Sequence, residues 1–378
     1  MDSEQLAYSE RTWGACHPQA IPTKRTSAPT RVGQQPFYFL HMMGDVDHIS
    51  PQNGCMTNFP TLDPELAAAV TMLPKIDFGD LPAARATFDA LTGTLLTDLS
   101  YDGVDLRTIT APGLDGDQDV TIRFFTPQNV EGPLPVLVWI HGGGFAIGTS
   151  ESSDPYCVDV VRALGLAVAN VEYRLAPETP FPGPLNDCYA ALSYVHAHAD
   201  ELGIDPTRIA VGGQSAGGGL AAGAVLKARD EGVVPVAFQL LEIPELDDRL
   251  TTTSMTEFVD TPLRHRPNAI LSWQFYLGEG YSGPEDPNVS IYAAPARATD
   301  LAGLPPTYLC TMELDPLRDE GIDYALRLLR AGVSVELHSF PGTFHGSALL
   351  ETAEVSKRGH AEALDALRRG LRTLAPAS

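Results

Sequence analysis

Residues 213–217 of this chain are Gly-Gln-Ser-Ala-Gly, and two further glycines follow directly. The motif comes after an apolar run at 209–212 that predicts a buried strand, and it opens a stretch that predicts a helix. A serine at such a strand-to-helix turn carries its hydroxyl above a sheet edge, and glycines flank it because a Cβ would crowd the turn. The pattern predicts a nucleophilic serine, Ser215.

A second glycine-rich segment lies upstream, where His141-Gly142-Gly143-Gly144-Phe145 follows another apolar run. Consecutive glycines can present backbone N–H groups to an oxygen that gains negative charge during a reaction. The N–H groups of Gly143, Gly144 and Ala216 are the predicted oxyanion hole. A nucleophile and an oxyanion hole in one chain predict an acyl-transfer enzyme.

An acid and a histidine follow the serine in the order expected for this arrangement. Asp315 stands in Glu313-Leu314-Asp315-Pro316, and His345 stands in a turn with Gly342 and Gly346 on either side. Serine is a weak nucleophile until a base takes its proton, so His345 is the predicted base. Asp315 would hold the imidazole in the productive tautomer and stabilise the imidazolium that forms.

From about Leu62 to Leu374 the sequence resembles the hormone-sensitive-lipase-like carboxylesterases, the bacterial type IV esterases of the α/β-hydrolase fold. The resemblance implies hydrolysis of carboxylic esters, no cofactor, and a helical cap above the active site. It is carried by several motifs at family-like spacings, namely 141–145, Tyr173-Arg174-Leu175-Ala176-Pro177-Glu178, 213–217, 315–321 and His345-Gly346.

The chain departs from the family pattern in ways that bear on substrate choice. Gln214 precedes the nucleophile where an acidic residue is common, Ser347 stands where an aromatic residue is common, and some sixty extra residues precede Leu62. Glu242 ends an apolar strand at a position that is usually uncharged. Some α/β hydrolases carry the triad acid after this strand, so Glu242 is an alternative to Asp315. If Glu242 is not the triad acid, we expect it to face the cap or to pair with Arg249, because an unpaired buried carboxylate is costly.

The pattern of strands and helices predicts an α/β-hydrolase fold with a mostly parallel sheet. In the first two predicted strands apolar and polar residues alternate, which suits antiparallel strands at the start of the sheet. Apolar strands then alternate with helices, a pattern that predicts a parallel sheet with helices on both faces. The predicted strands are 104–109, 119–125, 136–140, 167–172, 209–212, 236–243, 307–312 and 334–340. The predicted core helices are 153–164, 185–202, 216–230 and 318–331, and cap helices are predicted at 64–72, 82–91 and 263–277.

These elements divide the chain into an extension (1–60), the first part of the cap (61–100), core (101–249), a cap insertion (250–299) and core again (300–378). The extension is rich in Pro, Gly, Ser and Thr and predicts irregular structure. Its aromatic segment 37–43 needs a surface to pack on, so we expect residues 35–60 to cover the entrance to the pocket or to reach across a dimer. The group His41, Asp45, Asp47 and His48 matches no metal-binding spacing, and we expect a polar loop there.

Composition limits the partners of this protein. A net charge of −23 disfavours nucleic acid and anionic membrane surfaces. No apolar run approaches the length of a membrane span, and the N-terminus lacks the basic and apolar regions of a signal peptide, so a cytoplasmic location is expected. Five scattered cysteines indicate neither a zinc site nor a disulfide framework, and Cys157, Cys188 and Cys310 are expected to be buried.

The sequence thus predicts a serine carboxylesterase that acts on small to medium or aromatic esters through an acyl-enzyme, without metal or cofactor. A small-molecule ester is the expected partner, and a homodimer is left open. An amidase or lactonase would use the same residues. A catalytically silent small-molecule receptor on the same fold is the third alternative, although such receptors usually have a broken triad.

Overall fold

The computed structural model describes residues 62–130 and 132–372, and all structural statements below concern this part of the chain. The predictions for the extension lie outside it, including those for the aromatic segment and the His/Asp group. They stay predictions.

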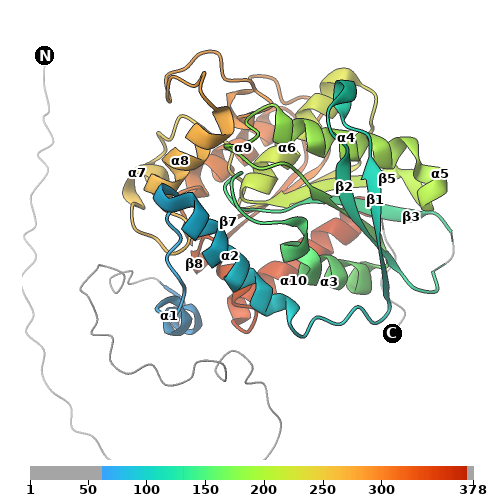
Figure 1. Ribbon diagram of the computed structural model, residues 1–378, viewed down its shortest axis with the longest axis horizontal. Helices are drawn as coiled ribbons and strands as arrows, with labels where there is room; N and C mark the ends of the chain where they lie inside the picture. The colour runs from blue at the N-terminus through green and yellow to red at the C-terminus, as the bar shows by residue number, and fades with distance from the viewer. Residues whose placement is uncertain (1–61, 131, 373–378) are drawn as a thin grey trace, which may run out of the picture. The chain divides into compact units, whose positions relative to one another are not determined.

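The core is an eight-stranded sheet in the order β1-β2-β4-β3-β5-β6-β7-β8 (Figure 1). The first two strands pair antiparallel with each other, and β2 also pairs antiparallel with β4. Every other neighbouring pair is parallel. The strands are β1 (Val104–Ala111), β2 (Val120–Pro127), β3 (Leu134–Ile140), β4 (Ala167–Glu172), β5 (Ile204–Gln214), β6 (Phe238–Glu242), β7 (Thr307–Leu314) and β8 (Val335–Phe344).

Helices cover both faces of this sheet, as the alternation of apolar strands and helices predicts. One face packs against α4 (Gly183–Ala197), α6 (Ala216–Glu231) and α9 (Arg318–Arg330). The other face packs against α3 (Asp154–Leu164) and α10 (Glu354–Leu371). In Figure 1 the two groups lie on opposite sides of the strands.

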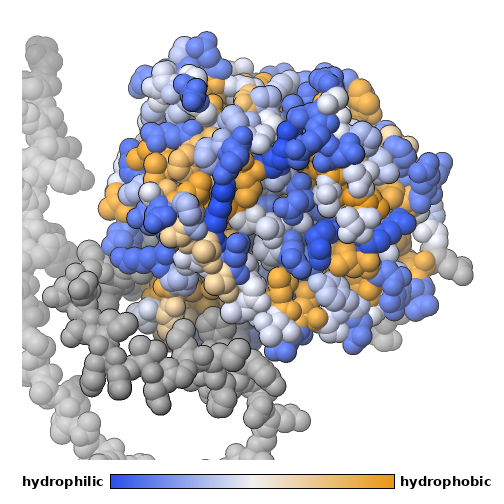
Figure 2. Space-filling model, viewed as in Figure 1, coloured by the Kyte–Doolittle hydropathy of each residue, from blue (hydrophilic) through white to orange (hydrophobic). Residues whose placement is uncertain are grey.

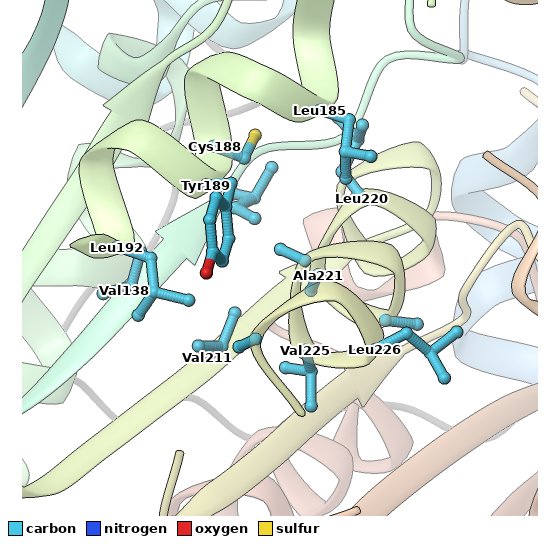
Figure 3. Close-up of a cluster of buried hydrophobic side chains, with 14 of the residues drawn as sticks. Val138, Leu185, Cys188, Tyr189, Leu192, Val211, Leu220, Ala221, Val225 and Leu226 are labelled. Carbon is cyan, nitrogen blue, oxygen red and sulfur yellow. The ribbon is translucent and has the colours of Figure 1, made fainter. Parts of the chain in front are cut away.

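The larger core lies between the sheet and the helices α4 and α6. Figure 3 shows Leu185, Cys188, Tyr189 and Leu192 of α4 close to side chains of α6, with Val138 of the sheet beside Leu192 and Val211 beside Val225. The alanines of α6 have small side chains, so the helix backbone packs closely on the sheet. This packing fixes the position of α6 next to the turn at Ser215 that precedes it. Cys157, Cys188 and Cys310 are free and buried, as expected from sequence.

Several elements differ from the sequence-based predictions. Helix α10 is not among the predicted helices, although its buried residues Ala363, Ala366 and Leu367 recur at helical spacing. Helix α8 (Arg266–Leu277) begins three residues later than expected, because Leu263 has a positive φ of 59° and Pro267 suits only the first turn of a helix. The single helix expected at 185–202 is broken at His198 into α4 and a short α5 (Ala199–Leu202).

The two segments predicted as parts of a cap contact each other. The first contains α1 (Pro64–Val70), the 3₁₀ turn η1 (Phe78–Asp80) and α2 (Leu81–Leu96), and the second contains α7 (Thr253–Glu257) and α8. The Asn268 side chain of α8 accepts from the N–H of Phe78 and donates to the carbonyl of Ile76. The rings of Phe78 and Phe275 also stack, with centroids 6.5 Å apart. Figure 2 shows hydrophobic surface around α2, α7 and α8 among hydrophilic residues.

None of the helices in residues 62–130 and 132–372 is both long and apolar enough to pass through a bilayer.

The close packing of α6 on the end of β3 generates a prediction. A Cβ at Gly217 would overlap the carbonyl oxygens of Ile140 and His141, whereas a Cβ at Gly93, exposed on α2, would meet nothing within 4 Å. Gly217→Ala should lower the free energy of unfolding by about 1–3 kcal/mol through overpacking. The control Gly93→Ala should raise it by about 0.5–1 kcal/mol. Urea unfolding measures both changes, and equal stabilities for the two variants would contradict the packing argument.

Candidate active site

Ser215 occupies a strained turn between β5 and α6. Its φ of 58° and ψ of −122° lie outside the regions that a serine adopts freely. Hydrogen bonds hold it there, because its N–H donates to the carbonyl of Glu242 at 2.9 Å and its carbonyl accepts from the N–H groups of Gly219 and Glu245, each at 3.0 Å. Three hydrogen bonds, from residues 242–245 and from the first turn of α6, therefore fix this backbone and orient the hydroxyl.

The structure brings Ser215 together with His345 and Asp315, from three separate strand ends. His345 Nε2 lies 2.9 Å from Ser215 Oγ, and His345 Nδ1 lies 2.7 Å from Asp315 Oδ2. The other oxygen of Asp315 accepts from the N–H of Leu317 at 2.9 Å, which fixes the carboxylate plane. A carboxylate at Nδ1 favours the tautomer with its proton on that nitrogen, so Nε2 is free to accept from the serine.

The glycine loop lies against the serine. A Cβ on Gly142 would stand 3.0 Å from the carbonyl oxygen of Gln214 and 3.4 Å from Ser215 Cβ. Gly143 and Gly144 have positive φ values of 129° and 56°, and the carbonyl of Gly143 accepts from the N–H groups of Ala146 and Ile147. Within the described chain, the N–H groups of Gly143, Gly144 and Ala216 donate to no other protein group.

His141, just before this loop, has a structural role. Its ring is buried and stacks on Tyr173 with centroids 4.3 Å apart. Nδ1 donates to the carbonyl of Gly142 at 2.7 Å, and the Tyr173 hydroxyl donates to the carbonyl of His141 at 3.0 Å. Burial lowers the pKa of His141, so the ring is neutral and holds the loop without adding charge.

Two arginines hold the segments around the loop. Arg85 of α2 pairs with Glu178 through two bonds of 2.7 Å and donates from Nε to the carbonyl of Ala146 at 2.9 Å. Arg174 donates from Nη2 to Asp187 at 2.7 Å and also pairs with Asp117. The first arginine ties the N-terminal helical segment to the loop, and the second fixes the chain after β4.

Glu242 lies apart from His345. Its Oε1 accepts from the Tyr156 hydroxyl at 3.1 Å, and the suggested pairing with Arg249 is wrong, because Arg249 pairs with Asp247 at 2.7 Å. Burial raises the pKa of Glu242 from 4.5 to about 7, and the hydrogen bond from Tyr156 opposes that rise only in part. Of the two candidate acids, Asp315 is the one that contacts the imidazole.

A buried ion pair beside the oxyanion loop was missed from sequence. Arg264, just before α8, pairs with Glu245, which follows β6; both are almost fully buried. Ser272 of α8 lies within hydrogen-bond distance of Glu245 at 3.0 Å and of the Gly144 carbonyl at 3.2 Å. A Cβ on Gly144 would meet Arg264 Nη1 at 2.9 Å. The signal was weak, because a Pro-Glu step after a strand and a lone arginine in a loop form no local motif.

Comparisons with known proteins agree with this geometry. The family described as alpha/beta hydrolase fold matches residues 137–349. The carboxylesterase NlhH of Mycobacterium tuberculosis is 38% identical over 321 residues, which are 82% of this chain and 97% of that protein. A solved structure of a bacterial heroin esterase is 81% identical, with a TM-score of 0.83, over 84% of this chain and all of that one. The esterase LipW of Mycobacterium marinum is 39% identical, with a TM-score of 0.74, over 82% and 96%.

This chain belongs to the alpha/beta hydrolase family, in its hormone-sensitive-lipase-like branch. The predicted fold and the predicted class of enzyme, a carboxylic ester hydrolase, are confirmed.

The environment of Glu242 generates a prediction about stability and pH. Because its folded pKa lies above the ordinary 4.5, the folded protein holds this proton more tightly than the unfolded chain, and stability is lost as pH rises from about 4.5 through about 7. Glu242→Gln removes that loss. The variant should gain on the wild type by ~2 kcal/mol between pH 5 and pH 8, less than the full shift implies because the side chain is partly solvated.

Urea unfolding at both pH values measures this gain. The control Glu201→Gln removes an exposed carboxylate on α5 and should show no such change. A Glu242→Gln effect that is the same at both pH values would contradict the assignment.

Proposed function

We propose that Ser215, His345 and Asp315 form the catalytic triad of this ester hydrolase. The observation that carries the proposal is the continuous chain of hydrogen-bond contacts Ser215 Oγ–His345 Nε2 (2.9 Å) and His345 Nδ1–Asp315 Oδ2 (2.7 Å). The three residues are 6%, 8% and 1% exposed, so little water competes for these contacts. An intact constellation of this kind also argues against a silent receptor.

The reaction proceeds in two steps. Ser215 attacks the ester carbonyl while His345 accepts the hydroxyl proton, and the imidazolium then protonates the departing alcohol as the tetrahedral intermediate collapses to the acyl-enzyme. Water next enters, and His345 takes one of its protons as its oxygen attacks the acyl group. The proton returns to Ser215 Oγ when the acid leaves. Asp315 stabilises the imidazolium in each half-reaction.

Gly143, Gly144 and Ala216 are proposed to donate their N–H groups to the tetrahedral oxyanion. Their lack of protein partners in the described chain supports this role, since such donors need no reorganisation when charge develops. Loss of one donor of this type typically costs about 3 kcal/mol of transition-state stabilisation. The buried contacts of Ser272 and Arg264 with Gly144 would hold the loop in place.

Residues 61–100 and 250–299 are proposed to form the cap. Phe78 supports this from the first segment, because a Cβ on Gly144 would lie 2.7 Å from its ring. Leu263 supports it from the second, because its Cδ1 would lie 3.1 Å from a Cβ on Gly346. Both segments thus contact residues beside the triad.

The proposed substrates are small esters with an aromatic alcohol or phenol portion. This inference rests on the 81% identity to a heroin esterase and on the aromatic side chains of the cap near the glycine loop. Matched esters and amides assayed side by side would separate esterase from amidase activity.

The proposed location is the cytoplasm. A homodimer is left as an open alternative to a monomer.

Replacing the nucleophile tests the proposal. Ser215→Ala should abolish hydrolysis of p-nitrophenyl acetate, because no other group can form the acyl-enzyme. The melting temperature should not fall, since only a hydroxyl is removed. A serine-directed organophosphate should label Ser215 in the wild type and nothing in the variant. More than a small residual activity in a clean preparation would refute this assignment.

The acid is tested by two matched substitutions. Asp315→Asn keeps the shape of the side chain but cannot hold the imidazole tautomer, so kcat should fall on the order of 10³–10⁴-fold. Glu242→Gln, which has no contact with His345, should change kcat far less. Steady-state kinetics of the two variants gives the ranking, and the reverse order would transfer the role to Glu242.

A further inference from the structure

A cavity of about 320 Å³ lies on the α3 and α10 side of the sheet, next to the triad. Gln214 and Ser347 line it, and they are close in sequence to Ser215 and His345. Glu242 lines it as well. The three side chains that depart from the family pattern therefore face one cavity, which neither the triad nor the oxyanion hole uses.

Among the described residues that line the cavity, three carboxyl groups face a single ammonium group. Glu242 lies at the sheet, and Asp159 and Glu351 line the side near α3 and α10. Burial, followed by the charge of Asp159, raises the pKa of Glu351. The ammonium of Lys357, which also lines the cavity, is paired with Glu354 at 2.6 Å.

His360 also lines the cavity but does not supply the missing charge near neutral pH. Burial lowers its pKa, against the opposing effect of Asp159, whose carboxylate lies 4.0 Å away. The cavity accordingly favours a positively charged guest.

Aromatic faces line the same space. The rings of Trp139 and Tyr156 stack with centroids 4.2 Å apart, and Tyr156 also meets the edge of His360 at 5.7 Å. Phe340 completes this part of the wall. Aromatic faces attract cations, and they also accommodate an apolar carbon skeleton.

Two buried polar groups in the wall have no partner in the described chain, the indole N–H of Trp139, which can only donate, and the hydroxyl of Ser347. Ser347 is 1% exposed, and its Oγ makes no hydrogen bond. A buried hydroxyl without a partner costs free energy that a ligand can recover. Its oxygen can accept from an N–H donor, as can the Glu242 carboxylate.

We propose that this cavity binds an organic ammonium group attached to an apolar or aromatic skeleton. Glu242 and Ser347 would accept the N–H donors, and Trp139 and Tyr156 would pack on the carbon skeleton. The ammonium group could belong to an ester that Ser215 cleaves or to a separate ligand, and both sources share this chemistry.

Binding is tested in full-length Ser215→Ala protein, so turnover plays no part. Isothermal titration should show that 2-phenylethylammonium binds and that its neutral analogue 2-phenylethanol binds much more weakly. Adding Glu242→Gln should weaken binding of the amine by about tenfold or more and leave binding of the alcohol unchanged, because a hydrogen bond to a charged group is lost. The matched control is Glu201→Gln, whose carboxylate lies outside the cavity. Equal binding of amine and alcohol, or an amine affinity that Glu242→Gln leaves unchanged, would overturn the proposal.

Two pairs of esters identify the source of the ammonium group. These kinetic experiments rest on the proposed function, whereas the binding experiment does not. For the acyl side, p-nitrophenyl 6-aminohexanoate is compared with p-nitrophenyl heptanoate. For the alcohol side, 4-(2-dimethylaminoethyl)phenyl acetate is compared with 4-(3-methylbutyl)phenyl acetate. A Glu242-dependent preference in kcat/KM for the amine member assigns the group to that side. Amine binding without any such preference assigns the site to a separate ligand.

Discussion

Gly217 stands in the first turn of α6, and the carbonyl oxygens of Ile140 and His141 occupy the space that any side chain there would need. This contact sets the distance between α6 and the end of β3. Because Ser215 precedes the helix and the glycine loop follows β3, the same distance places Ser215 against the start of that loop, at Gly142. The strained φ of Ser215 is tolerated because three hydrogen bonds, from residues 242–245 and from the first turn of α6, hold its backbone.

The sequence was most informative where function depends on local backbone. The strained serine turn and the glycine loop leave short motifs, because few residues fit such conformations. The chain order and the motif 315–321 favoured Asp315, but Glu242 also lies at the end of an apolar strand, and only the fold decides which carboxylate reaches His345. The pair Arg264–Glu245 was invisible from sequence, because its partners come from the cap insertion and the core and meet only after folding. Helix α10 had a readable apolar spacing and could have been predicted.

Glu242 at the end of β6 and Glu245 just after it illustrate opposite solutions to the cost of removing a carboxylate from water. Glu245 has a guanidinium and a hydroxyl beside it, so its charge is balanced within the protein and links cap to core. Glu242 has only the hydroxyl of Tyr156, and its pKa rises to about 7 as a result. The pair Glu245–Arg264, whose charges compensate each other, is explained by its structural role alone. A carboxylate left with one neutral partner in a cavity is better explained by a ligand that brings the missing charge.

The position of this cavity implies that its occupant would affect more than affinity. Gln214 and Ser215 are consecutive in one turn, and Ser347 lies two residues beyond His345, so the groups that contact the occupant share backbone with the nucleophile and the base. The free energy of a ligand's contacts with Gln214 and Ser347 can differ between the ground state and the transition state. The ligand then changes the free energy of both turns by that difference. Since the strained turn at Ser215 already stores conformational energy, a small displacement there alters the approach of the hydroxyl to the ester. Occupancy should for this reason be expressed in kcat as well as in KM.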